Sequence, residues 1–299
     1  MTQRSSILCP DCNKLISNYI DECPHCGLKS PGQKSKIYKL FGANQRSFVK
    51  IIITVNVIFF VASFLVPMFL PFRVDPITRS FGFLPAPSQI GVGVLGAAST
   101  KNMILGNWWT LITAMFLHGG IIHIAFNMLW VRDLGPMAEK FFSPHKMILI
   151  YLLSGIGGNY LAVNLPYIAQ SLPGILVRML QIPTENSAVI GASGAVFGLM
   201  GAIIAFGRKS GGFWGKQIAK QLGTWALLMI ILGFIIPRVS NAGHIGGFVT
   251  GYAVGWLLPV NRPKSNNWIY IILGNTGVLL CMYAFYRSVD RIVNIESMM

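Results

Sequence analysis

The sequence predicts an all-α polytopic membrane protein with seven transmembrane helices and a small cysteine-rich module at its N-terminus. Three observations lead to this fold class. Of the 299 residues, 53% are hydrophobic and 11% are charged, whereas about 25% of the residues in an average soluble domain are charged. Seven apolar segments are each long enough to cross a hydrocarbon core of about 30 Å as a helix. Two Cys-x-x-Cys pairs precede the first of these segments.

The cysteine-rich module comes first along the chain. Its two Cys-x-x-Cys pairs are separated by ten residues. At this spacing four thiolates can surround a zinc ion tetrahedrally, and we expect a structural Zn²⁺ there. The expected ligands are Cys9, Cys12, Cys23 and Cys26. The alternative is two redox pairs or disulfides, which the cytoplasmic location expected below disfavours.

Residues 1–30 resemble a zinc ribbon, a type of module used for binding or regulation. In so short a segment the metal would supply most of the folding free energy. Residues 31–47, rich in Lys, Ser, Gly and Gln, are predicted to form a flexible basic linker. The module either senses metal or docks a cytoplasmic partner, or it only stabilises or anchors the protein, and the sequence leaves both open.

The seven apolar segments follow the linker. They cover roughly residues 48–70, 120–141, 146–165, 190–207, 219–237, 242–260 and 267–287. Gly119-Gly120 interrupts the apolar run before the second segment, so residues 71–119 are predicted to form a long, partly embedded loop. The fifth cysteine, Cys281, lies in the last segment, where we expect it to face lipid or to pack.

The distribution of positive charge predicts the orientation in the membrane. The net charge is +15. If all seven segments span and the N-terminus is cytoplasmic, 17 of the 24 Lys and Arg residues lie on the inner side and 7 on the outer side. This positive-inside bias explains the charge without nucleic acid as a partner. Binding of lipid headgroups by residues 29–50 is the alternative. We expect a multi-pass protein of a bacterial cytoplasmic membrane, with a cytoplasmic N-terminus.

Ser193 is the first polar residue at membrane depth that points to chemistry. It lies in the stretch Gly191-Ala192-Ser193-Gly194, at the start of the fourth apolar segment. Polar side chains inside a membrane are costly and usually functional. A nucleophilic serine needs a nearby base and close backbone approach, and glycines permit that approach.

His244 is the candidate base, and it opens the sixth segment. Gly247, Gly251 and Gly255 follow at intervals of four residues, which is the small-xxx-small pattern of closely packed membrane helices. At about 100° per residue, His244 projects within about 60° of all three glycines. The stripe is therefore expected to carry His244 against a neighbour, for which the fourth segment with Gly194 is the candidate.

His123 and Asn127 lie four residues apart on the second segment and so share one helix face. They could direct hydrogen-bond donors into a cavity, or they could form an interhelical hydrogen-bonding pair that only holds helices together. In the predicted topology the second, fourth and sixth segments run in the same direction. Ser193, His244, His123 and Asn127 then lie at similar depth near the outer surface.

This constellation predicts a serine protease dyad. His244 would act as general base for Ser193 and then as general acid for the leaving amine. His123, Asn127 and the Ser193 backbone N–H would form the oxyanion hole. None of the nine acidic residues falls near His244 in an outer helix half, so the dyad lacks a third acid. Phe197, one turn after Ser193, would stack on His244 instead.

These motifs resemble the rhomboid family of intramembrane serine proteases. The resemblance rests on His118-x4-His123-x3-Asn127, Gly191-Ala192-Ser193-Gly194 and Gly243-His244, with further similarity around Trp109–His118 and Leu134–Glu139. It implies a six-helix core over residues 48–260, with residues 261–299 adding one more helix and a short tail. It also implies cleavage of membrane-anchored proteins in or beside their transmembrane segments, with Ser193 as nucleophile and no metal or cofactor in the chemistry.

Two departures and two alternatives accompany the resemblance. The family often has Trp-Arg where this chain has Trp109-Thr110, and often has tyrosine where this chain has Phe197. A non-catalytic relative that binds membrane clients normally lacks the serine or the histidine, and this chain keeps both. A transporter or channel is disfavoured because few acidic residues lie at membrane depth. Transmembrane protein substrates and the lipid bilayer are therefore the expected partners.

Overall fold

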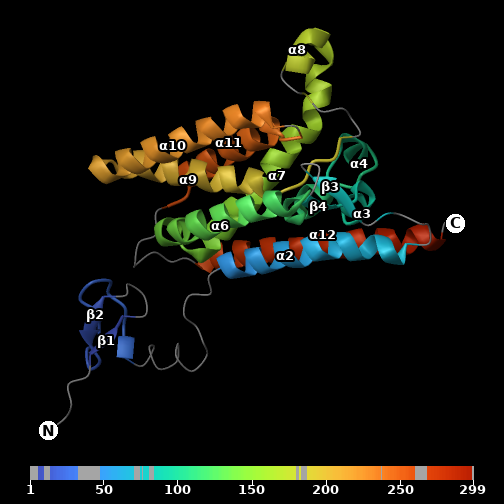
Figure 1. Cartoon of the computed structure of the whole chain (residues 1–299). Helices are drawn as coiled ribbons and strands as arrows, with labels where there is room; N and C mark the ends of the chain where they lie inside the picture. Colours follow the sequence, from blue (N-terminus) through green and yellow to red (C-terminus); the bar gives the residue numbers. More distant parts are fainter. Residues whose placement is uncertain are drawn as a thin grey trace.

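In a computed structural model of the chain, the structure describes residues 6–9, 14–32, 48–70, 75, 77–80, 84–179, 182, 187–236, 238–259 and 268–297. Most of the described chain is helical, which confirms the predicted helical membrane fold. Figure 1 shows the long helices gathered in one bundle, with α9, α10 and α11 on one side of α6 and the pair α2 and α12 on the other.

Each of the seven predicted segments corresponds to one long helix. They are α2 (Phe48–Leu65), α6 (Ile121–Phe142), α7 (Pro144–Ile168), α9 (Ser193–Ser210), α10 (Gly212–Ile235), α11 (Asn241–Leu257) and α12 (Trp268–Ser297). A 3-10 turn, η1 (Val66–Phe69), extends α2, and η3 (Ala169–Ser171) extends α7; a short helix, α8 (Gly174–Met179), follows.

The long helices differ in how far length and composition alone mark them as membrane spans. Among the described residues, α2 with η1, α7 with η3, α10 and α12 are long and apolar enough, and α6 joins them when it is counted with the helical turns before it, from which it is bent by 94°. α11 has only 17 residues, and α9 ends in Arg208 and Lys209. α9 lies inside the bundle, with 13 of its 18 residues buried, whereas α11 buries only one face, 7 of its 17 residues. A helix enclosed by others, as α9 is, needs less apolar surface of its own.

Glycines set the packing of α11 against α9. A methyl group at Gly247 would overlap the carbonyl oxygen of Gly194, and one at Gly251 would overlap that of Gly198. The next glycine of the stripe, Gly255, meets α9 one turn further on. The two backbones therefore touch directly, as the sequence pattern predicts for small-xxx-small helices.

The segment before α6 is more structured than the predicted loop 71–119. Its described part contains an antiparallel pair, β3 (Ile77–Ser80) and β4 (Leu84–Pro87), followed by α3 (Gln89–Val94), α4 (Thr100–Ile104), α5 (Thr110–Thr113) and η2 (Ala114–Phe116). Ser88 and Ser99 cap α3 and α4 by accepting backbone N–H groups three residues later. Local capping by serine explains why short helices form here. We call residues 84–116 the outer segment.

The N-terminal module is a small hairpin with a cysteine core. β1 (Ser6–Leu8) pairs antiparallel with β2 (Leu15–Ser17). Ile16 is buried in a cluster with Cys9, Cys23 and Cys26. Most of the predicted linker, residues 33–47, lies outside the described residues.

Candidate active site and metal site

Ser193 is the first residue of α9, and the backbone before it is held in an unusual conformation. Gly191 has φ +123°, a region that residues with a side chain rarely adopt. A Cβ at Gly191 would also lie 2.7 Å from Nε2 of His123. The Gly191 N–H donates to the carbonyl of Ala114 at 2.9 Å. Only glycine fits here, and it lets the chain turn into α9 beside the His123 ring.

The structure brings Ser193 and His244 together. The Ser193 Oγ lies 3.0 Å from Nε2 of His244. His244 lies in the first turn of α11, whose N-terminus is capped by Ser240, which accepts the Gly243 N–H at 3.2 Å. The Ser240 cap sets where α11 begins, and the glycine stripe sets how closely α11 approaches α9.

The opposite edge of the His244 ring carries the second ring nitrogen, Nδ1. This atom is buried and has no hydrogen-bond partner in the described part of the chain. The ring instead stacks on Phe197, with ring centroids 4.3 Å apart and planes 13° from parallel. Stacking of this kind holds an aromatic ring in place at about 0.5–1.5 kcal/mol beyond the burial of its area. Phe197 therefore fixes the plane of the ring where other serine sites use a carboxylate.

His123 presents a donor toward the same place. Its Nδ1 accepts the backbone N–H of Gly119 at 3.3 Å. A neutral imidazole has one N–H, so this hydrogen bond assigns the proton to Nε2. That Nε2 is the atom next to Gly191, two residues before Ser193. An Nε2–H group there can donate to an anion formed at Ser193.

Asn127 lies one turn further along α6 and is buried. Its Nδ2 donates to the carbonyl of His123 at 2.9 Å. A side-chain amide has two N–H bonds, so one remains for a second acceptor. The predicted residues thus come from the starts of three helices, α6, α9 and α11, which meet at one end of the bundle. We call this end the site end.

Backbone groups that carried no recognisable sequence signal complete the site. The Ala114 carbonyl and the Gly119 N–H hold Gly191 and His123, and neither can be read from side-chain types. His118 is fully buried and packs edge-on against His123, with ring centroids 4.9 Å apart. This ring contact limits how far His123 can turn.

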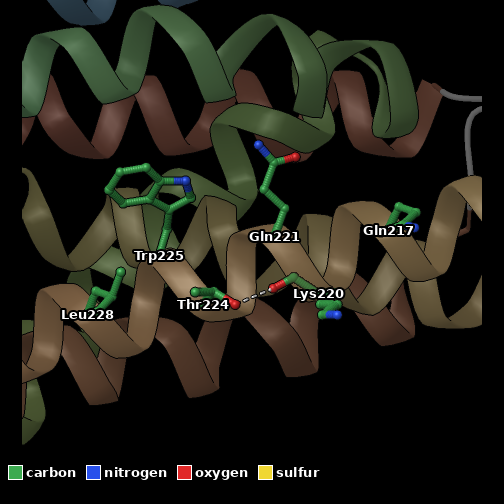
Figure 2. A pocket seen from close by; sticks show the side chains of 6 residues that line it. All are labelled: Gln217, Lys220, Gln221, Thr224, Trp225 and Leu228. Atoms are coloured by element: carbon green, nitrogen blue, oxygen red, sulfur yellow. Dashed lines mark hydrogen bonds between the residues drawn. The ribbon is translucent and has the colours of Figure 1, made fainter.

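A hollow on α10 is separate from these residues. It has a volume of about 480 Å³ and is lined by Gln217, Lys220, Gln221, Thr224, Trp225 and Leu228. Figure 2 shows Gln221 and Trp225 pointing toward the neighbouring helices, and Thr224 donating to the Lys220 carbonyl at 3.0 Å. The Trp225 ring lies 6.0 Å from that of Trp130 on α6. The hollow contains none of the predicted site residues.

The cysteine core of the N-terminal module fits a metal. The Sγ atoms of Cys9, Cys23 and Cys26 all lie within 4.8 Å of one another. Cys9 and Cys26 have their Sγ atoms 3.6 Å apart, too far for a disulfide of about 2.05 Å. Tetrahedral zinc with Zn–S bonds of about 2.3 Å places its sulfurs about 3.8 Å apart. The fourth predicted ligand, Cys12, lies outside the described residues.

The surroundings of Cys23 favour the thiolate that metal binding needs. Burial raises the pKa of the Cys23 thiol, but hydrogen bonds from the backbone N–H groups of His25 and Cys26 and from neighbouring thiols lower it, to about 7. Thiolate is the form that binds a metal ion. The three described cysteines can therefore hold a zinc ion.

The sequence matches the Rhomboid domain family over residues 105–261. It is similar to RHOMBOID-like protein 6, mitochondrial, of Arabidopsis thaliana, with 34% identity over 201 residues, 64% of this chain and 59% of the relative. RHOMBOID-like protein 2 of the same plant is 32% identical over 229 residues, 76% of this chain and 63% of the relative.

A bacterial relative carries the word protease in its name. Rhomboid protease GluP of Bacillus subtilis (strain 168) is 32% identical over 162 residues, 52% of this chain and 27% of the relative. The chain spans less than two thirds of the length of each of these three relatives. The matched range 105–261 contains all the predicted dyad and donor residues, and it leaves out the N-terminal module and α12.

Proposed function

This chain belongs to the rhomboid family and is an integral membrane protein, and from that premise we propose that it is an intramembrane serine endopeptidase. Its substrates are membrane-anchored proteins, cleaved in or beside their transmembrane segments. The observation that carries the proposal is the 3.0 Å distance between Ser193 Oγ and His244 Nε2. That distance is within the reach that proton transfer between a nucleophile and its base requires.

The first step forms an acyl-enzyme. Ser193 Oγ attacks the scissile carbonyl carbon while its proton passes to Nε2 of His244, which becomes an imidazolium. When the tetrahedral intermediate collapses, the C–N bond breaks and His244 returns the proton to the leaving amine. In the second step His244 takes a proton from water, the resulting hydroxide attacks the ester, and Ser193 regains its proton as the carboxyl product leaves.

The oxyanion of the tetrahedral intermediate needs donors on the side away from His244. Nε2–H of His123, the free amide N–H of Asn127 and the backbone N–H of Ser193 are the groups we assign to this role. Loss of one such donor typically lowers turnover by about 10²–10³. Because Nδ1 of His244 has no acceptor among the residues that the structure describes, we assign the position of the imidazolium to Phe197 and not to a carboxylate.

The test of this proposal is cleavage of a transmembrane substrate by the full-length protein in the membrane. Ser193→Ala and His244→Ala should each lower cleavage by about 10³ or more while thermal unfolding in detergent is unchanged. Cleavage at the wild-type rate by either variant contradicts the dyad. A protein that binds the substrate and leaves it intact supports the second candidate function, a rhomboid-like client-binding protein.

We propose a separate role for residues 1–30: a zinc module on a linker, residues 31–47, ahead of a protease core of residues 48–260 and a final segment of residues 261–299. The triangle of Cys9, Cys23 and Cys26 supports it, with Cys12 as the fourth ligand. The purified protein should contain about one zinc per chain, and Cys23→Ser should abolish the metal content. Full zinc content in that variant contradicts the ligand set.

The module also bears on orientation and partners. We propose that the N-terminus is cytoplasmic, on the side opposite the dyad, where the module senses metal or docks a cytoplasmic partner. Deletion of residues 1–30 should then change activity or partner binding, and unchanged values leave the module a stabilising or anchoring role. Modification of Cys9 by an impermeant thiol reagent in sealed, metal-depleted cells would contradict the orientation.

A further inference from the structure

We propose that α12 positions Ser193 by clamping the outer segment, residues 84–116, and that Arg287 and Phe285 are positioning residues for the proposed reaction. This inference rests on the proposed protease function. It concerns a helix that lies outside the matched family range of residues 105–261.

One face of α12 is buried against the rest of the protein. Ala284 and Ser288, one turn apart, are 0% and 2% exposed. On the other face, Met282, Tyr286 and Val289 are more than half exposed. Such one-sided burial over two turns indicates that α12 packs against the bundle through one defined face.

Two arginines near the end of α12 contact the outer segment. The Arg287 guanidinium lies over the ring of Trp109 at 4.1 Å from its centroid. One turn later, Arg291 Nη1 donates to Oδ1 of Asn102 at 3.1 Å. The family's frequent Trp-Arg pair is Trp109-Thr110 in this chain, and here a guanidinium from the seventh helix occupies the face of that tryptophan. A cation over an indole contributes about 0.5–2 kcal/mol, more when desolvated.

Apolar contacts continue along this face of α12 toward the middle of the bundle. Phe285 stacks on Phe59 of α2, with centroids 3.8 Å apart, and meets Phe116 of η2 edge-on at 5.4 Å. Ser288 lies against Gly96, where an added Cβ would come 2.6 Å from its Oγ. α12 therefore contacts the outer segment at two places, at Gly96 within it and at Phe116, its last residue.

The outer segment is in turn hydrogen-bonded to the chain that leads into Ser193. The Ala114 carbonyl accepts the Gly191 N–H at 2.9 Å. Ala98 and Val189 exchange two backbone hydrogen bonds, of 3.1 and 2.7 Å. Movement of the outer segment thus moves Gly191, and with it the gap between Ser193 and His123. A shift of about 1 Å at a reacting group can cost about 10²-fold in rate.

The other end of α12 is also tied to the bundle. The buried Lys146 of α7 donates from Nζ to the Pro259 carbonyl at 3.1 Å and lies 4.5 Å from the centroid of the Tyr270 ring of α12. Further along, Gly274 and Gly277 of α12 allow close contact with α7. Because α12 is held at both ends, its position relative to α7 sets the position of the outer segment.

The test compares variants of the full-length protein in detergent by three readouts. These are the rate of Ser193 modification by a fluorophosphonate, kcat and KM for a transmembrane substrate, and thermal unfolding. Arg287→Gln and Phe285→Leu should lower the modification rate and kcat by about 10-fold with KM unchanged. Arg287→Lys should restore part of the loss, because an ammonium also binds an indole face. Tyr286→Leu, on the exposed face, is the matched control and should behave as wild type.

Three results would contradict either the role of α12 or the proposed function. Wild-type rates in Arg287→Gln and Phe285→Leu overturn the clamp. A loss that equals the lost folded fraction, measured by unfolding at the assay temperature, also overturns it, because α12 then only stabilises. A wild-type protein that the reagent does not modify at Ser193 overturns the proposed function itself, which separates the two failures.

Discussion

The proposed dyad and the proposed oxyanion donors at the site end are held by two different kinds of packing. Ser193 and His244 are brought together by the α9–α11 interface, where glycines let two backbones touch. His123 and the turn at Gly191 are instead held through the outer segment, which side chains of α12 press into place. The backbone contact between α9 and α11 leaves no room for adjustment. The contacts of α12 with the outer segment are made by long side chains, so substitutions there can shift the outer segment. The proposed nucleophile and base are thus held rigidly, whereas the proposed oxyanion donors are held by contacts that can adjust.

The largest effect is expected at the glycine interface. Gly251→Leu forces a side chain onto the Gly198 carbonyl and should destabilise the protein by about 3 kcal/mol or prevent folding. Gly223→Leu on α10 is the matched control, because nothing lies within 4 Å of a Cβ there. Thermal unfolding in detergent measures both. Equal stability of the two variants would show that the α9–α11 contact is not the rigid part.

A smaller effect, on activity more than on stability, is expected at the turn between the two regions. Gly191→Ala places a methyl group against His123 at a backbone φ of +123°. Cleavage should fall by about 100-fold, while the melting temperature changes by only a few degrees. Kinetics and unfolding on the same preparation check this. An active Gly191→Ala protein would mean that His123 does not need its place beside Gly191.

The smallest effect is expected in the adjustable region. Gly96 and Gly106 both have positive φ, +98° and +76°, but only Gly96 lies against α12, while a Cβ at Gly106 meets nothing within 4 Å. Gly106→Ala should therefore cost only the backbone strain of about 1 kcal/mol. Gly96→Ala should cost roughly 1 kcal/mol more, from crowding of Thr113 and Ser288, and should lower kcat several-fold. Equal results for the pair would remove Gly96 from the clamp.

The same contrast explains how much the sequence could predict. The stripe Gly247, Gly251 and Gly255 is periodic, so it indicated which face of α11 meets α9 and that His244 lies at that contact. Stacking of Phe197 on His244 followed from helical spacing alone. Both involve residues whose types and intervals carry the signal.

The outer segment offers no such periodicity. The hydrogen bond between the Gly191 N–H and the Ala114 carbonyl joins two backbone groups, so no side-chain type indicates that these two positions pair. The contact of Arg287 with Trp109 joins positions 178 residues apart, with neither residue unusual in its own surroundings. The β3–β4 pair was missed because Pro85 and Pro87 argue against a strand, although a two-stranded sheet consists of edge strands, which tolerate proline. The seven helices were predicted in position, but for α9 burial within the bundle, more than apolar length, accounts for its place.

One measurement tests the central claim most directly: the site and rate of modification by a fluorophosphonate, which reacts with a serine only when a base activates it. In the wild-type, full-length protein the reagent should attach at Ser193, identified by mass spectrometry. His244→Ala should slow this reaction by about 10³, although Ser193 and the fold remain. Modification of His244→Ala at the wild-type rate, or no modification of the wild-type protein at Ser193, would contradict a Ser193–His244 dyad.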